Sequence, residues 1–306
     1  MGLFESVVLT IITASTPLLL AALGELVVER AGVLNLGLEG MMVIGAVCGF
    51  VAGYTSESAT LGVIAAVVAG VLMSMLFAFF TQTLATNQVA TGLALTLFGL
   101  GLSGLIGERF TGLPGVKLPA LNIPVLSELP IVGPLIFGHD ALVYLSVGLT
   151  IGVAYTLRRT RLGLIIRATG DNHHSAHALG YRVVLVRYGC IGFGGACAGL
   201  AGAYLSLSYT PQWVENMTSG RGWIALALVV FSTWLPGRLM IGAYLFGAVW
   251  IMGLYVQGIG VGIPPQLLSA APYLATIIAL IVISGNRSLT KANTPKCIGQ
   301  PFVPER

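Results

Sequence analysis

Nine apolar runs, each close to the length of a membrane-spanning helix, recur along the 306 residues of this chain. A helix that crosses the hydrocarbon core of a bilayer needs about 20 predominantly apolar residues. Charged residues make up only 8% of the sequence, whereas a water-soluble domain carries about 25%. The chain is therefore expected to be an all-α polytopic membrane protein with about nine transmembrane helices. The runs cover approximately residues 6–28, 36–54, 59–81, 88–107, 140–157, 188–207, 221–236, 238–256 and 266–284.

Some stretches depart from plain spanning helices. Residues 29–40, ERAGVLNLGLEG, are rich in glycine and include Glu39, so the second span is expected to be broken or re-entrant. A Pro-Gly-Arg sequence at 236–238 predicts a tight turn between two short spans. The glycine- and alanine-rich run 192–203 is expected to be a packing face between helices. The four cysteines have no CxxC spacing and are expected to pack without forming disulfides.

Positive charges predict the orientation of the bundle, because Lys and Arg accumulate in cytoplasmic loops. Six arginines fall between positions 158 and 187, and placing this segment and the C-terminus in the cytoplasm puts twelve of the fifteen Lys and Arg residues inside. The N-terminus is then outside. Residues 1–285 are expected to form the transmembrane domain and residues 286–306 a cytoplasmic tail. The inner residues are Arg30, Arg158, Arg159, Arg161, Arg167, Arg182, Arg187, Arg238, Arg287, Lys291, Lys296 and Arg306, and the outer ones are Arg109, Lys117 and Arg221.

The longest outer segment runs from Glu108 to His139. It is rich in Pro and Gly, which excludes a regular helix. It is either a cap over an entrance or a tether between two halves of the bundle, and the sequence leaves both interpretations open.

The polar segment DNHHSAHALG, residues 171–180, has the pattern of a short helix outside the lipid. Asp171 or Asn172 can cap its start and Gly180 its end, which leaves about two helical turns. Its apolar side chains are expected to insert into a groove on a soluble partner, and the flanking arginines suit anionic lipid headgroups. The alternative is an ordinary connecting loop with solvated cations. The apolar side chains are Ala176, Leu179 and Tyr181.

This segment also carries a resemblance. Residues 167–206, RATGDNHHSAHALGYRVVLVRYGCIGFGGACAGLAGAYLS, resemble the coupling segment and following span of permeases from ATP-binding-cassette (ABC) importers. The subfamily resembled serves simple sugars, nucleosides and branched-chain amino acids. His173, His174 and His177 depart from the commoner choices at their positions. The residues that fit the pattern are Arg167, Ala168, Gly170, Asp171, Asn172, Ala176, Leu179 and Gly180.

Three further stretches carry the same resemblance, which covers residues 7–285. Residues 29–46 resemble the broken second span of these permeases, and residues 87–107 resemble a pore-lining span. Residues 220–236 are similar to a span in the second half of nucleoside-type permeases. The first and last of these stretches favour nucleosides as the solute.

The resemblance implies a type II ABC importer-like bundle in a bacterial inner membrane. Its expected partners are an ATPase that grips residues 171–180, a second permease chain, and a substrate-binding lipoprotein or periplasmic protein, with no nucleic acid. The sequence has no GxxxxGK[ST] phosphate loop, so ATP and Mg²⁺ are expected on the separate ATPase. The chain itself is expected to hold no cofactor and to catalyse no reaction. His173 and His177 have metal-pair spacing but no clear third ligand nearby, so no metal site is expected.

Six polar or aromatic residues in the matched stretches are candidates for the solute path. Glu39 is either a path residue or a cap for a broken helix, and the amides either meet solute or join helices. Arg221 and Trp223 are most simply interpreted as anchors at the membrane–water interface. Other functions left open are a permease for simple sugars or branched-chain amino acids, an ion-coupled transporter that uses Glu39, and a bundle without transport. The candidates are Asn35, Glu39, Asn87, Gln88, Arg221 and Trp223.

Overall fold

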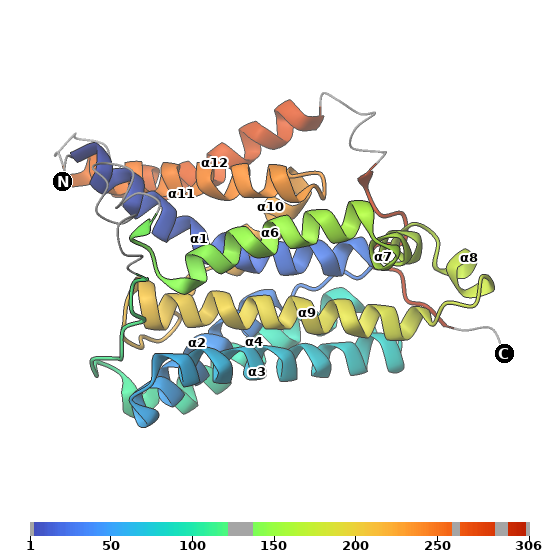
Figure 1. Ribbon diagram of the computed structural model, residues 1–306, viewed down its shortest axis with the longest axis horizontal. Helices are drawn as coiled ribbons and strands as arrows, with labels where there is room; N and C mark the ends of the chain where they lie inside the picture. The colour runs from blue at the N-terminus through green and yellow to red at the C-terminus, as the bar shows by residue number, and fades with distance from the viewer. Residues whose placement is uncertain (1–2, 122–136, 259–263, 285–292, 304–306) are drawn as a thin grey trace.

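The computed structural model describes residues 3–121, 137–258, 264–284 and 293–303. Within these residues the chain is almost entirely helical, and its long helices pack along one axis of the molecule (Figure 1). The fold class expected from the sequence is confirmed. The helices are α1 (Leu3–Arg30), α2 (Leu38–Ser56), α3 (Ala59–Ala78), α4 (Gln88–Gly107), α6 (Ala141–Arg159), α7 (Arg161–Asp171), α8 (His173–Ala178), α9 (Val183–Tyr204), α10 (Arg221–Phe231), α11 (Pro236–Gly258) and α12 (Pro265–Ser284), and the short turns η1 (Phe79–Thr83), η2 (Glu108–Phe110) and η3 (Leu205–Tyr209) extend α3, α4 and α9.

Seven of the described helices are long and apolar enough to cross a bilayer, and they account for the first six predicted spans and for the span at 238–256. α12 coincides with the last predicted span and has 20 residues, none of them charged. The run 221–236 behaves differently, because α10 has only 11 residues. Such a helix is about 16 Å long, roughly half the thickness of the hydrocarbon core. The short span expected at 221–236 is therefore present only as a helix too short to cross the hydrocarbon core by itself.

The glycine- and alanine-rich run of α9 is the packing face that the sequence predicts. A Cβ atom on Gly45 of α2 would come within 2.7 Å of the Gly199 Cα, and Gly195 lies against Gly70 of α3. α9 also packs along α1. These contacts bring several backbones together around α2, which is mostly buried. All four cysteines are free, as expected.

The second crossing is broken as predicted. α1 ends at Arg30 and α2 begins at Leu38, with an irregular segment between them. Side chains from neighbouring helices satisfy the backbone of this segment. The Gln88 side-chain oxygen accepts a hydrogen bond from the Leu34 amide at 2.8 Å, and the Thr96 hydroxyl donates to the Leu36 carbonyl at 2.9 Å. Irregular backbone is tolerated at membrane depth where protein groups pair it in this way.

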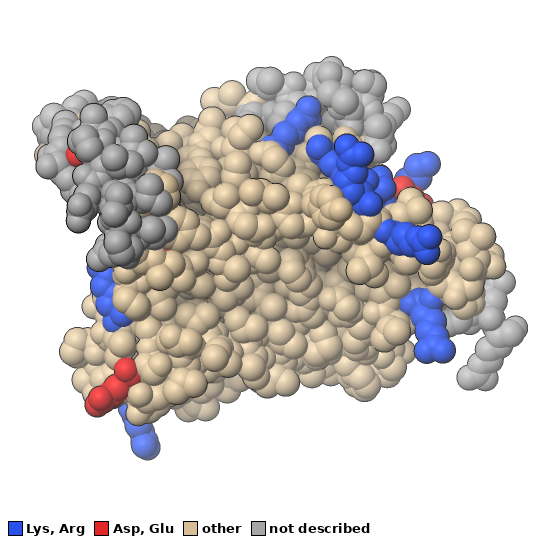
Figure 2. Space-filling model, in the orientation of Figure 1, with Lys and Arg blue, Asp and Glu red and all other residues tan. Residues whose placement is uncertain are grey.

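The two ends of the bundle carry different elements. α7, α8 and the described C-terminal segment 293–303 gather at one end, which we call the α8 end, and the N-terminus lies at the opposite end (Figure 1). On the face shown in Figure 2, Lys and Arg side chains are concentrated at the α8 end. This is the charge asymmetry that the orientation prediction requires. Arg287, Lys291 and Arg306 lie outside the described residues.

The Pro- and Gly-rich segment 108–139 is described only in part, because residues 122–136 lie outside the described residues. Residues 115–118 of this segment lie beside residues 207–211, at and after the end of α9. The Gly115 amide donates to the Pro211 carbonyl at 2.9 Å, and the Leu118 amide donates to the Leu207 carbonyl at 2.8 Å. The choice between a cap and a tether stays open.

Candidate functional site

α8 forms where the capping residues predict it. The Asn172 side-chain oxygen accepts a hydrogen bond from the Ser175 amide at 3.0 Å, and Gly180 follows the helix with a φ of +88°. The helix covers only six residues, His173–Ala178. Asp171 is the last residue of α7, so Asn172 alone is the cap. The predicted short helix is confirmed.

One of the three apolar side chains expected to face a partner is buried instead. Leu179 is 76% exposed and Tyr181 is 40% exposed, whereas Ala176 is only 2% exposed. Ala176 packs in a small cluster with Val183 and Phe302. The expectation that Ala176 inserts into a partner is therefore wrong, because the chain's own C-terminal segment covers it.

The C-terminal segment lies against α7 and α8. The Cys297 amide donates to the Gly170 carbonyl at 2.8 Å. The Phe302 ring lies among three histidine rings of α8, with centroid distances between 5.2 and 5.8 Å. The three histidines of α8 therefore pack around an aromatic side chain. Within the described residues, no group of three or more His, Cys, Asp or Glu side chains could hold a metal ion.

Arg187 joins α8 to three other parts of the chain. Its side chain is fully buried at the start of α9. The guanidinium donates to the Ala31 carbonyl at 3.2 Å, the Gln82 side-chain oxygen at 3.4 Å and the Gln300 carbonyl at 3.1 Å, and it lies 3.2 Å from the His173 Nδ1 atom. From the sequence, Arg187 is predicted only to be one of the positive charges that orient the bundle. The apolar residues at 183–186 precede it, so apolar sequence lies on both sides of Arg187, and this is the signal that marks it as buried.

Burial keeps the His173 ring neutral. Desolvation, followed by the charges of Arg187 and His174, lowers the pKa of His173 from 6.5 to about 4. A neutral ring can accept an N–H from the guanidinium. As the pH falls from 6.5 towards 4, the unfolded chain binds a proton that the folded chain does not, so acid weakens this part of the fold.

Glu39 caps α10 from across the bundle. Its carboxylate accepts hydrogen bonds from the Thr218 hydroxyl at 2.6 Å, the Gly220 amide at 2.8 Å and the Gly222 amide at 2.5 Å. The first amides of a helix have no partner within the helix, and its N-terminus attracts negative charge. Of the two sequence interpretations, the hydrogen bonds favour the cap, and the capped helix is α10 rather than α2.

The start of α10 lies deep in the bundle. Gly40, next to Glu39, packs against Leu95 of α4, about 10 Å along that helix from its first residue. Arg221 is half-buried, and its guanidinium lies 5.6 Å from the Tyr209 ring centroid and 5.7 Å from that of Trp250. A cavity of about 20 Å³ adjoins Arg221. Arg221 is therefore not an interface anchor, because α10 begins inside the bundle.

Residues 7–284 match the family of branched-chain amino acid transport system permease components. The chain belongs to this permease family. A permease component of this kind is the non-catalytic membrane subunit of an ABC transporter, binds no cofactor itself, and works with a separate ATPase and a solute-binding protein. The chain is thus a multi-pass membrane protein, as the helices indicate.

Individual permeases are similar over most of their length. TsgC13 of Haloferax volcanii, described as a candidate glucose ABC transporter permease, is 41% identical over 292 residues, which are 88% of each chain. The nucleoside permease NupC of Lactococcus lactis is 30% identical over 98% of this chain and 97% of its own. The guanosine permease NupQ of Bacillus subtilis is 30% identical over 97% of both chains.

A solved structure supports the permease fold. It is described as an inward-facing conformation of a candidate metal-chelate type ABC transporter, and it matches with a TM-score of 0.52. The match covers 91% of this chain and 85% of the other chain. Because the sequence identity is only 15%, the match supports the fold alone.

The remaining path candidates of this permease are engaged in local structure. The Asn35 side-chain oxygen accepts from the Gly37 amide at 3.0 Å. Gln88 holds the irregular segment, as described above, while Asn87 is exposed and caps α4. Trp223 is 38% exposed. Of these amides, Gln88 joins α4 to the segment before α2, as the helix-joining interpretation expects, whereas the contacts named for Asn35 and Asn87 are local.

Two buried carboxylates of the permease escape the sequence analysis. Glu25 and Glu29 lie one turn apart near the end of α1 and are at most 1% exposed. Glu25 accepts from the Asn35 amide at 3.2 Å, and Glu29 accepts from the Trp234 indole at 2.6 Å. The signal available in the sequence is two Glu residues at i, i+4, the first inside the apolar run 6–28 and the second directly after it.

Proposed function

We propose that this permease forms part of the solute path of an ABC importer for a simple sugar and that its ATPase docks on α8. The observation that carries the docking proposal is the geometry of α8: a capped helix at one end of the bundle with Leu179 three-quarters exposed. The fully buried core of a protein–protein interface is more apolar than the rest of the protein surface, which suits an exposed leucine at a docking site. The docking residues proposed are Asp171, Asn172, Leu179 and Gly180, all exposed.

The choice of a sugar rests on the relatives. Identity to a candidate glucose permease is 41%, against 30% for the two nucleoside permeases. This supports the alternative in the sequence analysis better than the nucleoside reading. At the site, Arg221 beside Tyr209 and Trp250 offers hydrogen-bond donors and ring faces to a polar solute. Glu39 would position Arg221 by fixing the start of α10.

The concentration of arginines supports a cytoplasmic α8 end and an outer N-terminus, by the positive-inside rule. A bacterial host remains a prediction, because the relatives include permeases of Haloferax volcanii.

A second permease chain is also proposed to complete the pore. TsgB13 of Haloferax volcanii is 24% identical over 88% of this chain, so one organism has two permeases similar to it. α4 is buried over little of its length and exposes an apolar stripe that a partner can cover. The stripe comprises Val89, Leu93 and Leu97, at 40%, 43% and 71% exposure.

The solute proposal is tested by ATPase stimulation in nanodiscs that contain the permease, its ATPase and its binding protein. Glucose or a related hexose is expected to stimulate ATP hydrolysis, while guanosine and leucine leave the basal rate unchanged. Stimulation by nucleosides alone would restore the nucleoside reading. Uptake that survives ATP depletion and stops when the ion gradient collapses would instead indicate a secondary transporter.

A further inference from the structure

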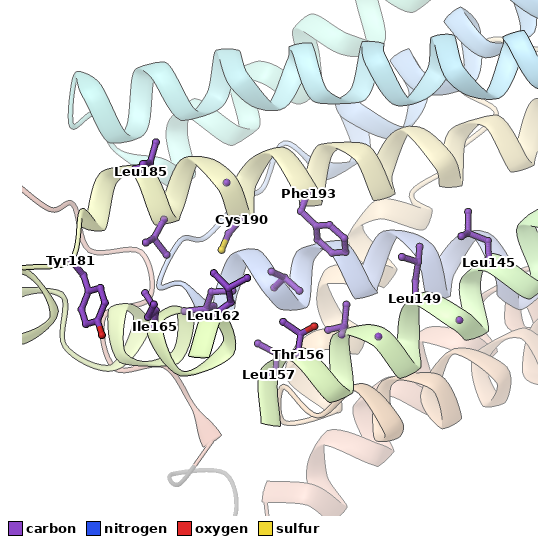
Figure 3. A pocket seen from close by; sticks show the side chains of 17 residues that line it. Leu145, Leu149, Thr156, Leu157, Leu162, Ile165, Tyr181, Leu185, Cys190 and Phe193 are labelled. Atoms are coloured by element: carbon purple, nitrogen blue, oxygen red, sulfur yellow. The ribbon is translucent and has the colours of Figure 1, made fainter. Parts of the chain in front are cut away.

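An apolar groove of about 630 Å³ runs between α6 and α9 (Figure 3). Leu149 of α6 and Phe193 of α9 extend into it from opposite walls, and Val27 of α1 contributes to its lining. Thr156, Tyr181 and Cys190 alone among its 17 lining residues carry a polar side-chain atom. A groove of this chemistry suits a hydrocarbon chain rather than a polar solute.

Three glycines keep the groove open. A Cβ atom added to Gly148, Gly152 or Gly189 would meet no atom within 4 Å. At Gly195 and Gly199 of the packing face, by contrast, a Cβ atom would strike neighbouring backbone. The three groove glycines therefore leave space that no side chain of the described bundle fills. Empty apolar space forfeits dispersion contacts, so an occupant stabilises it.

The α6 wall of the groove is about as long as one leaflet, and α7 residues continue the lining beyond the end of α6. The α6 wall extends from Leu145 to Leu157, which is about 18 Å of helix. One leaflet contributes about 15 Å of hydrocarbon. On α9 the groove stops at Phe193, although that helix continues to Tyr204. A transmembrane helix of a partner chain would need a trough across both leaflets.

Positive charge surrounds the α8 end of the groove. Arg158 and Arg161 flank the lining residues Leu157 and Leu162, and further arginines follow in the chain beside them. Lys and Arg also gather at this end of the face shown in Figure 2. The exposed arginines of this set are Arg158, Arg159, Arg161 and Arg182.

We propose that the groove is a binding site for an anionic phospholipid of the leaflet at the α8 end. One acyl chain lies between α6 and α9, and the phosphate is held by the arginines beside α7. Guanidinium groups pair well with phosphate, and basic clusters at a membrane surface attract anionic lipids. The site is separate from the proposed solute path and does not depend on the solute.

The test compares phosphatidylglycerol with phosphatidylcholine of the same acyl chains. The full-length permease is purified in detergent, each lipid is added back, and thermal unfolding and native mass spectra are recorded. Phosphatidylglycerol is expected to raise the melting temperature more than phosphatidylcholine and to remain bound in the mass spectrum. Equal effects of the two lipids would contradict the proposed headgroup contact.

Variants locate the site. Gly152→Leu and Gly189→Leu fill the groove without a backbone clash, and leucine favours a helix more than glycine does. Both are expected to fold and to lose the phosphatidylglycerol response. The matched control is Gly101→Leu on α4, where a Cβ atom also meets nothing, and it should keep the response. The proposal would be overturned if both groove variants kept the phosphatidylglycerol response. It would also be overturned if the groove variants failed to bind the second permease chain while they still bound phosphatidylglycerol.

Discussion

Glu39→Gln is expected to destabilise the permease and to abolish transport. The carboxylate accepts three hydrogen bonds at the start of α10, and an amide nitrogen cannot accept the bond from the Gly222 amide. A buried donor left without a partner costs about 1–3 kcal/mol. The released helix end would also move Arg221, so transport should suffer more than folding.

Two further variants test whether the effect comes from the cap on α10. Gly222→Ala should reproduce the defect, since its Cβ atom would lie 2.6 Å from a Glu39 carboxylate oxygen and 2.7 Å from the Glu39 Cα. Glu57→Gln is the control, because this exposed glutamate lies at the other end of α2. Thermal unfolding and solute uptake are measured for all three. Wild-type stability and uptake in Glu39→Gln would show that the cap on α10 is dispensable.

Arg187→Leu is expected to release the C-terminal segment and to loosen α8. The change removes the donors to Ala31, Gln82 and Gln300, and the two buried acceptors, on Ala31 and Gln82, each cost about 1–3 kcal/mol when left unpaired. Phe302 would then lose its place against Ala176. Hydrogen exchange at 173–180 and 293–303 should rise markedly.

A lysine at position 187 separates charge from geometry. Arg187→Lys keeps the positive charge but cannot reach all the acceptors with one ammonium group, so an intermediate exchange rate is expected. Arg182→Leu removes an exposed arginine from the same region and should leave exchange unchanged. Equal exchange in the Leu variant and in the wild type would mean that the C-terminal segment is held by other contacts.

Features set by local sequence patterns could be predicted. The apolar runs give the long helices, the glycines at 32–40 accompany the broken second crossing, and Asn172 with Gly180 delimits α8. Each depends on residues within one or two turns of one another. The resemblance predicted the family correctly. Its preference for nucleosides as the solute rested on two stretches, whereas identity along the whole chain is higher to a candidate glucose permease.

Features set by distant contacts could not be predicted. α10 stops at Phe231, and the turn that follows contains Thr233 and Trp234 with φ values of 50° and 54°. The turn therefore comes before the Pro-Gly-Arg sequence at 236–238 that predicts it, because Pro236 already begins α11. The start of α10 is fixed by a carboxylate more than 180 positions earlier in the chain. Ala176 is buried by Phe302, which the sequence places in a tail. Such pairings leave no periodic pattern in the residues themselves.

Photo-crosslinking from Leu179 tests the central claim most directly. A photoreactive residue replaces Leu179 in one variant and Leu121, which is 46% exposed beside the start of α6 at the opposite end, in a second variant. The crosslinked partner is identified by mass spectrometry after irradiation of intact cells. The account predicts an ABC ATPase bound to position 179 and none bound to position 121. An ATPase bound to position 121, or position 179 labelled only by reagents added outside the cell, would contradict it.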